Sequence, residues 1–134
     1  MALKSDPRDW SDPRHRRGAY GEEIAKRFLE RRGWVIRAHR FRVGRWEVDL
    51  VAEQAGVIAF VEVKTRQTDA FGSPLEAVTW SKQREIARVA KAWTDRYGTL
   101  EHTIRFDVIG VTLGPDSGVR SIEHVENAFW PGWR

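Results

Sequence analysis

The chain has 134 residues, a formal net charge of +4 and no cysteine. Its length fits one domain with a core of its own, and the lack of thiols excludes disulfides and thiolate metal sites. Because no secretory segment and no apolar run of membrane-spanning length is found, we expect a cytoplasmic protein without a membrane partner.

The N-terminal part of the chain predicts a loose arm followed by a helix. Residues 1–14 are polar and carry two prolines, which is typical of a flexible basic arm. From about residue 18 to residue 32, apolar side chains recur at helical spacing. Gly33 follows where a helix C-cap is expected, and residues 34–41 then predict a first strand.

The remaining elements alternate between strands and one more helix. We expect strands at about 46–53 and 57–65, a loop over 67–74, a helix over about 79–97, a buried strand over 103–113 and a last strand over 121–125. The predicted order is α-β-β-β-α-β-β, an α/β fold with a single mixed central sheet flanked by helices. The main domain is expected to span residues 15–127, with a Trp-rich tail over 128–134.

Ionisable residues lie inside the two strands best suited to form the core. In the first strand, alternation places Glu47 and Asp49 on one face with Val51. The same alternation places Val48 and Leu50 together on the opposite face. Acidic groups are therefore predicted at a position where apolar side chains are usual.

The next strand carries Glu62 and Lys64 at the end of an apolar face that begins with Ile58 and Phe60. A two-residue turn at 55–56 would pair Asp49 with Glu62 and Glu47 with Lys64. Carboxylates in directly opposed positions repel unless a positive charge, such as a divalent cation or Lys64, lies between them. The alternative is a half-exposed strand whose charges form ordinary ion pairs.

The first helix supplies a further carboxylate. On a helical wheel Glu22 borders the apolar stripe formed by Ala25, Phe28 and Leu29, whereas Glu23 points away from it. Glu22 is therefore predicted to reach toward the charged end of the sheet. The alternative is an acid of the first helical turn that favours the helix dipole.

Basic residues are concentrated in the first third of the chain. Residues 1–45 hold 13 Lys and Arg against six Asp and Glu, and residues 46–134 hold ten against 13. Eighteen of the 23 basic residues are arginines, whose guanidinium groups match phosphate oxygens. This favours a polyanionic partner such as nucleic acid, with plain solubility as the alternative.

Five ordered motifs carry a family resemblance. The stretches GxxGExxAxxFLxxxGW, EVDLVA, FVEVKTR, FGSPLEAV and RFDVIGV, from Gly18 to Val111, resemble the YraN family of bacterial proteins. A helical Glu, an Asp and a Glu-x-Lys are similar to the PD-(D/E)XK nuclease superfamily, and the implied fold is similar to that of archaeal Holliday-junction resolvases. Trp46 departs from the family pattern, which would place glycine before Glu-x-Asp.

The resemblance implies a metal-dependent endonuclease that hydrolyses phosphodiester bonds in DNA, including branched or structured DNA. Asp49 and Glu62 would bind Mg²⁺ or Mn²⁺, with the Val63 carbonyl as a third protein ligand, and Glu22 would hold a water or a second ion. Lys64 would complete the catalytic set by orienting the nucleophile or stabilising developing charge, and Glu47 would hold Lys64. A non-catalytic nucleic-acid-binding adaptor with the same fold is the alternative.

Several basic residues are candidates for contacts with the nucleic acid, DNA being favoured over RNA. Direct phosphate contacts are expected from Arg66, Lys82 and Arg84, and salt-dependent affinity from Arg14, Arg16, Arg17, Arg40, Arg42 and Arg45. A solvated surface position is the alternative for each of them. A homodimer is left open.

Three other features are not assigned to the predicted site. Asp107, inside an apolar strand, is expected to pair with a nearby arginine such as Arg105 or Arg66. The four histidines lack the spacing of zinc ligands. Core packing or tail docking is expected for most tryptophans, those of the tails included, in preference to base stacking.

Overall fold

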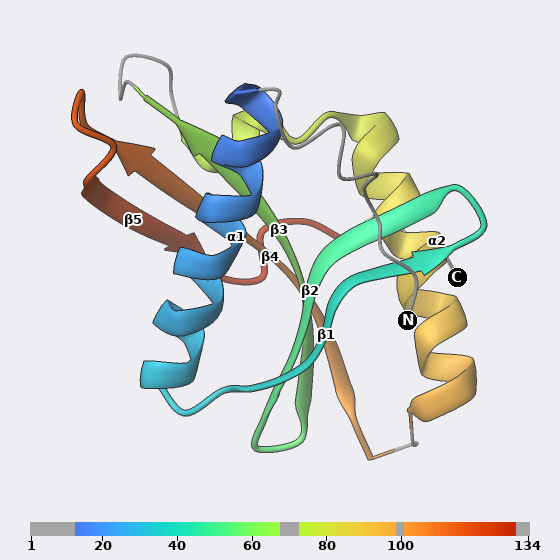
Figure 1. Ribbon diagram of the computed structural model, residues 1–134. Coiled ribbons are helices and arrows are strands. Elements are labelled where there is room, and N and C mark those ends of the chain that lie inside the picture. Colours follow the sequence, from blue (N-terminus) through green and yellow to red (C-terminus); the bar gives the residue numbers. More distant parts are fainter. Residues whose placement is uncertain (1–12, 68–72, 99–100, 131–134) are drawn as a thin grey trace.

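The computed structural model describes residues 13–67, 73–98 and 101–130, with side chains from residue 18 onward (Figure 1). Its elements are helix α1 (Pro13–Arg31), strands β1 (Val35–Val43), β2 (Trp46–Gln54) and β3 (Val57–Arg66), the 3₁₀ helix η2 (Pro74–Ala77), helix α2 (Trp80–Tyr97), and strands β4 (Thr103–Leu113) and β5 (Val119–Val125). Apart from the short η2, this is the predicted order of elements.

Helix α1 begins earlier than the periodicity indicated. Its first residue is Pro13, and proline is favoured there because its missing N–H would have no partner in the first turn of a helix. Residues 13 and 14, which were assigned to the arm, are therefore helical. Residues 1–12 of the predicted arm lie outside the described residues.

The strands form one mixed sheet in the order β1-β2-β3-β4-β5. Strands β3 and β4 are parallel, and the other three neighbouring pairs are antiparallel. A parallel pair needs a long crossover, and α2 provides it between β3 and β4. This confirms the predicted single mixed sheet.

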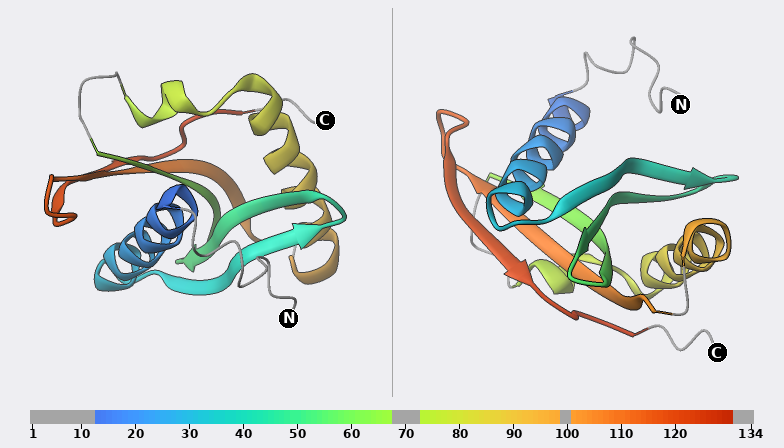
Figure 2. Two further views of the ribbon diagram at one scale, coloured as in Figure 1. Left: turned by 45° about the horizontal axis from the view of Figure 1, so that its top comes forward. Right: turned by 90° about the horizontal axis from the view of Figure 1, so that it is seen from below.

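Each face of the sheet carries one helix (Figure 2) and one hydrophobic core cluster. On the first face Ala25 and Leu29 of α1 pack against Val61 and Val63 of β3. On the second face α2 packs against a cluster that includes Phe60 of β3. The prediction that Phe60 and Val61 face opposite sides of the sheet is confirmed.

The β2–β3 hairpin has the predicted register. Pairing runs from Gln54 and Val57 to Leu50 and Val61, and both turn residues have positive φ, 50° at Ala55 and 81° at Gly56. Such angles are typical of a tight two-residue hairpin turn. Asp49 and Glu62 lie just beyond the last of these pairs, and their carboxylates are left to meet outside the regular ladder.

The predicted alternation along β2 is wrong around Asp49. Leu50 packs in the cluster beneath α1, whereas Val48 packs in the cluster beneath α2, although the two were expected on one face. On the neighbouring strand β1, Arg40 has a φ of 57° and stands between the partners of Leu50 and Val48. A left-handed residue in a strand bends the strand and re-aims its side chains.

The start of the predicted Trp-rich tail docks on the sheet. The Ala128 N–H donates to the Phe106 carbonyl at 2.6 Å, the Phe129 ring stacks on the Phe106 ring at 5.3 Å, and Trp130 meets Phe106 edge-on at 5.6 Å. The expected docking of the tail tryptophans is therefore observed for Trp130. Trp10 and Trp133 lie outside the described residues.

Candidate functional site

Two carboxylates from neighbouring strands meet where β2 bends away from β3. The Val63 N–H donates to Asp49 Oδ2 at 2.8 Å, which fixes the Asp49 carboxylate beside Glu62. Only 4% of Glu62 is exposed, and its Oε1 atom is buried with no hydrogen-bond partner among the described residues. The site therefore contains a buried carboxylate oxygen with unused capacity to accept a ligand.

The surroundings of this carboxylate pair disfavour its doubly ionised form. Burial, and then the charge of Glu22, raises the pKa of Asp49 to about 6. Burial, and then the charge of Asp49, raises the pKa of Glu62 well above its ordinary value. Additional positive charge at this position would stabilise both carboxylates.

Helix α2 brings a lysine to the pair. Thr79 caps the helix by accepting from the Lys82 N–H at 3.0 Å, and this fixes the first turn beside β2. Lys82 Nζ then lies 3.8 Å from Glu62 Oε2 and donates to Glu85 Oε2 and to the Glu47 carbonyl, both at 3.1 Å. Lys82, a candidate for phosphate contact, is thus placed against the carboxylates themselves.

Glu22 approaches the site from α1 and is held by two residues of β1. It is 7% exposed, and its Oε1 atom lies 2.8 Å from His39 Nε2 and 2.5 Å from Arg40 Nε. Burial alone would raise its pKa, but the hydrogen bonds from His39 and Arg40 lower it below the ordinary value. The prediction that Glu22 faces the sheet is confirmed, whereas Glu23 is 41% exposed and pairs with Arg27.

The remaining acidic and basic residues of the motif lie close by. Lys64 follows Glu62 on the same face of β3, half-buried, and its charge lowers the pKa of Glu62 against the effect of burial. The Glu47 N–H donates to Glu85 Oε2 at 3.1 Å, and the Glu47 carboxylate lies 3.6 Å from Arg42 Nε. Five acidic side chains therefore surround the bend: Glu22, Glu47, Asp49, Glu62 and Glu85.

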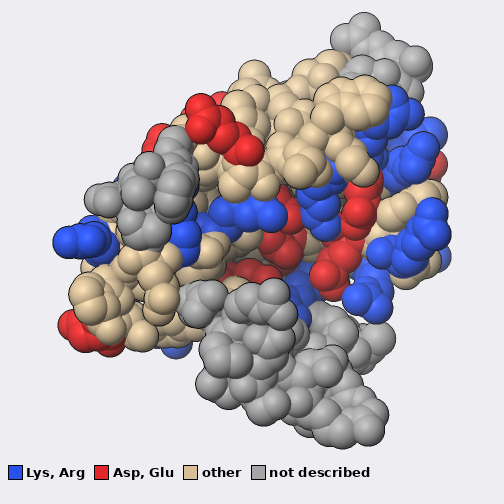
Figure 3. Space-filling model, turned by 90° about the horizontal axis from the view of Figure 1, so that it is seen from above, with Lys and Arg blue, Asp and Glu red and all other residues tan. Residues whose placement is uncertain are grey.

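Basic side chains border the acidic centre. In Figure 3 the acidic atoms gather in a hollow of this face, with Lys and Arg side chains on both sides of it. Among the predicted nucleic-acid contacts, Arg42, Arg45 and Arg84 are exposed and Arg66 is half-buried. Arg14, Arg16 and Arg17 belong to the first turns of α1, where side chains lie outside the described part.

Two arginines cover the unexpected tryptophan. The Arg88 guanidinium lies 5.0 Å from the centre of the Trp46 ring, and that of Arg45 lies 6.0 Å from it. The ring also packs against the core cluster under α2. The Trp46 ring thus holds two guanidinium groups beside the β1–β2 hairpin.

The donor set fits a hard divalent cation. Mg²⁺ is commonly held by one or two carboxylates together with water and phosphate oxygens, and Asp49 and Glu62 supply two carboxylates, one with an unsatisfied oxygen. Among the described residues no group of three or more His, Asp or Glu side chains is arranged to hold a metal ion. An ion here would therefore take its other ligands from backbone carbonyls, water or substrate.

Several members of this cluster escaped prediction from sequence. His39 was expected to be unrelated to the site, and no local pattern connects it with Glu22. Arg40 was taken as a sequence-blind phosphate contact. Glu85 was not considered, although its spacing of three residues from Lys82 on a predicted helix places the two side chains on one face.

Asp107 has the structural role that was expected. It is fully buried and accepts two hydrogen bonds from Arg105 at 2.9 Å, one from the Asn127 N–H at 2.9 Å, and contacts His124 Nε2 at 2.8 Å. All its partners belong to β4, β5 and the segment after β5. It is therefore committed to the fold rather than to the candidate site.

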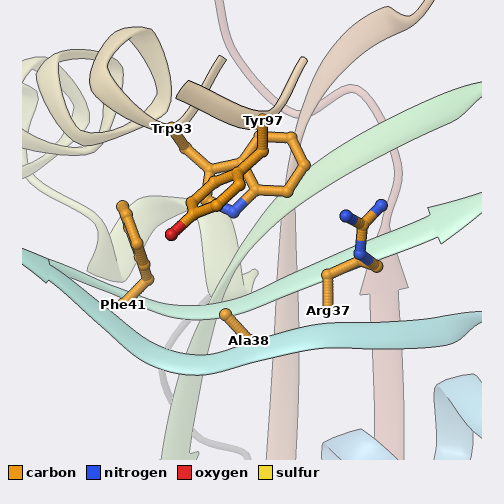
Figure 4. A pocket seen from close by; sticks show the side chains of 5 residues that line it. All are labelled: Arg37, Ala38, Phe41, Trp93 and Tyr97. Atoms are coloured by element: carbon orange, nitrogen blue, oxygen red, sulfur yellow. The ribbon is translucent and has the colours of Figure 1, made fainter. Parts of the chain in front are cut away.

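A separate pocket lies between β1 and the C-terminal half of α2 (Figure 4). It has a volume of about 250 Å³ and is lined by Arg37, Ala38, Phe41, Trp93 and Tyr97. None of the predicted site residues lines it.

Within the described chain, no helix is long and apolar enough to cross a membrane.

Comparison with known proteins shows similarity to one protein family. The sequence model of "Uncharacterised protein family UPF0102" matches residues 21–111, a range that includes every carboxylate of the site. A UPF0102 protein of Geobacter sulfurreducens is 47% identical, with 84% of this chain and 87% of the relative covered. The UPF0102 protein of Symbiobacterium thermophilum is 44% identical, with 84% of this chain and 94% of the relative covered. That of Alkaliphilus metalliredigens is 38% identical, with 84% of this chain and 96% of the relative covered.

One solved structure shows a weaker likeness. The structure of Pyrococcus furiosus SfsA in complex with Ca²⁺ has 17% sequence identity and a TM-score of 0.30, with 81% of this chain and 61% of that chain covered. A likeness at this level carries no argument about function.

Proposed function

This chain belongs to the UPF0102 family, the family named YraN in the sequence resemblance, and we propose that it is an endonuclease that uses Mg²⁺ or Mn²⁺ to hydrolyse phosphodiester bonds in DNA. The observation that carries this proposal is the Asp49–Glu62 pair. Two adjacent carboxylates with raised pKa values and an oxygen without a hydrogen-bond partner among the described residues destabilise the metal-free fold. A bound cation would offset this cost. Strongly perturbed carboxylates of this kind are typical of functional sites.

In this proposal, Asp49, Glu62 and Lys64 have distinct roles. A bound divalent cation would supply charge neutralisation on the phosphate and a lowered pKa for water. Asp49 and Glu62 would hold it, with the Val63 carbonyl as a further ligand, and the Val63 N–H orients Asp49. Lys64, two residues beyond Glu62, would stabilise negative charge as it develops on the phosphate.

Glu22 is suited to orienting a water. Glu22 lies in the middle of α1, where His39 and Arg40 of β1 hold its carboxylate, and its charge acts on Asp49. A residue that is fixed by two hydrogen bonds can hold a nucleophile in position without moving. This supports the role that the family resemblance implies for it.

Basic residues around the hollow support a nucleic-acid substrate. The exposed Arg42, Arg45 and Arg84 lie on β1, its turn and α2, and all three are suited to contacts with phosphate groups. DNA, and branched or structured DNA in particular, is the substrate class that the resemblance implies. The acidic centre between basic borders fits a phosphate backbone that is bound at its flanks and attacked in the middle.

One observation favours the alternative of a non-catalytic adaptor. Arg40 forms an ion pair with Glu22, and Glu62 has Lys82 within 3.8 Å, so the chain's own cations partly compensate the acidic cluster. An adaptor would need the basic borders alone and would bind DNA equally well without Asp49. The two functions therefore differ in what a change at Asp49 does.

The test is cleavage of labelled single-stranded, duplex, flap and four-way-junction DNA in Mg²⁺, Mn²⁺ or chelator. We expect metal-dependent cleavage by the wild type, and a loss of at least about a hundredfold in Asp49→Asn. Asp95→Asn is the matched control, because Asp95 is 69% exposed on α2 and pairs with Lys91 on the same helix. Binding without cleavage in every metal, equal in wild type and Asp49→Asn, would instead establish the adaptor.

A further inference from the structure

We propose that Lys82 is a built-in counter-ion of the Asp49–Glu62 pair, and that a divalent cation at this pair must displace the Lys82 ammonium group from Glu62. This inference rests on the proposed function, because it assumes that the pair is the metal site. It adds a residue that sets how tightly the ion binds.

The position of the ammonium group is the first argument. Lys82 Nζ lies 3.8 Å from Glu62 Oε2, and its charge acts on both Glu62 and Asp49. A divalent ion bound by both carboxylates would meet a positive charge a few ångströms away. Like charges at such distances repel strongly where water is partly excluded.

The attachment of Lys82 is the second argument. Two of its hydrogen bonds, to Glu85 Oε2 and to the Glu47 carbonyl, are 3.1 Å long and do not involve the carboxylate pair. The contact with Glu62 is longer, at 3.8 Å. Lys82 can therefore give up Glu62 while Glu85 and Glu47 keep holding it, so displacement requires only a small movement of the side chain.

The orphaned oxygen is the third argument. Lys82 faces Oε2 of Glu62, whereas Oε1 of the same carboxylate has no hydrogen-bond partner among the described residues. A single ammonium group thus compensates the pair only in part. The pair is left stable enough to fold, with one oxygen available to an incoming ion.

The test is the affinity for Mn²⁺, measured by titration calorimetry on the metal-free protein without DNA. Lys82→Gln should bind Mn²⁺ about tenfold more tightly than the wild type, since the repulsion is removed and half-exposure moderates its size. Protons also compete for the carboxylates, but Lys82 repels a doubly charged ion about twice as strongly as a proton. The net change therefore favours the ion.

Lys91→Gln is the matched control. It removes the same charge from the same helix, at a side chain that is 65% exposed and pairs with Asp95, and it should leave the Mn²⁺ affinity unchanged. Equal or weaker Mn²⁺ binding by Lys82→Gln than by the wild type would overturn the proposal. If Lys91→Gln gained as much affinity as Lys82→Gln, a general charge effect would replace the specific role of Lys82.

Two further measurements keep the proposal separate from the proposed function and from folding defects. Asp49→Asn should abolish Mn²⁺ binding; if it does not, the pair is not the metal site, and both proposals fall. If Lys82→Gln does not fold, NMR of the lysine side-chain NH₃⁺ groups in the wild type replaces it. The Lys82 signal should then shift during a Mg²⁺ titration, and an unchanged Lys82 signal at saturation would refute displacement.

Discussion

The ionised form of Asp49 destabilises the folded protein. An ordinary Asp has a pKa of 3.8, and burial together with the charge of Glu22 raises that of Asp49 to about 6. Between these two pH values the folded protein binds a proton at Asp49 more tightly than the unfolded chain does. The contribution of Asp49 to the stability of the metal-free protein is therefore expected to fall as the pH rises from about 4 to about 6.

Replacing Asp49 should reveal this cost. Metal-free Asp49→Asn is expected to match the wild type near pH 4 and to exceed its free energy of unfolding at pH 7 by on the order of 2 kcal/mol, because the amide cannot ionise. Urea denaturation in chelator at both pH values measures this, with the exposed Asp95→Asn as control. A variant that is less stable than the wild type at pH 7 would show that Asp49 supports the fold instead.

Arg40 also combines an unfavourable conformation with a contact in the candidate site. A left-handed φ is unfavourable for residues other than glycine and asparagine, yet Arg40 has a φ of 57°. In this conformation its Nε reaches Glu22 Oε1, and its charge acts on Glu47 and Asp49. The unfavourable backbone angle therefore coincides with the point at which β1 meets the acidic cluster.

At the scale of elements, a single glycine determines how closely α1 approaches β3. A Cβ atom added to Gly21 would lie 1.8 Å from Thr65 Oγ1, so only glycine permits this contact between helix and strand. Glu22 follows directly and is carried to the site by the same contact. In this helix, packing against the sheet outweighs the helix propensity that glycine lacks.

Two glycine-to-alanine changes in α1 should therefore have opposite effects. Gly21→Ala is expected to lower the free energy of unfolding by about 1–3 kcal/mol through overpacking. Gly18→Ala, where nothing lies within 4 Å of the added Cβ, should raise it by about 0.5–1 kcal/mol through helix propensity. Thermal or urea denaturation gives both values, and a stabilised Gly21→Ala would contradict the close packing.

A buried carboxylate connects the last elements. Burial alone would raise the pKa of Asp107, but the hydrogen bonds from His124, Arg105 and the Asn127 N–H lower it. These contacts join β4 to β5 and to the segment that docks on Phe106. Asp107 and Asp49 are both acids within strands. Hydrogen bonds lower the pKa of Asp107, whereas desolvation and the charge of Glu22 raise that of Asp49.

For the whole molecule, the distribution of charge matters more than the net value of +4. The acidic cluster occupies a hollow, and basic groups border it (Figure 3). A polyanion is attracted by the borders and repelled by the centre until cations compensate the carboxylates. Binding of DNA is therefore expected to depend on both salt and divalent ions.

The salt dependence of DNA binding tests this arrangement. In chelator, the logarithm of the affinity for duplex DNA should fall linearly with the logarithm of the salt concentration, and Arg42→Gln/Arg45→Gln should reduce the slope by about 1–2. Arg96→Gln/Arg120→Gln removes the same charge from exposed positions on α2 and β5 and should change the slope less. Equal changes in both double variants would argue against the β1–β2 hairpin as part of the interface.

Features that depend on neighbouring residues in the chain could be predicted from the sequence. Alternation along β3 placed Glu62 behind Ile58 and Phe60, and the turn at residues 55–56 predicted the β2–β3 register, because strand faces and tight turns follow from local backbone geometry. The pairing of Asp107 with Arg105 was predictable for the same reason, since both lie on one face of β4.

Features that depend on how separate elements meet were decided by the tertiary structure. The contacts of Glu22 with His39 and Arg40 require α1 to cross β1 at a particular height, and the contact of Lys82 with Glu62 requires the capped end of α2 to lie over β3. Val48 packs on the opposite face of the sheet from Leu50, and the hydrophobic pattern gives no signal of this change. Such contacts arise from the packing of whole elements, and side-chain periodicity within one element carries no information about its neighbour.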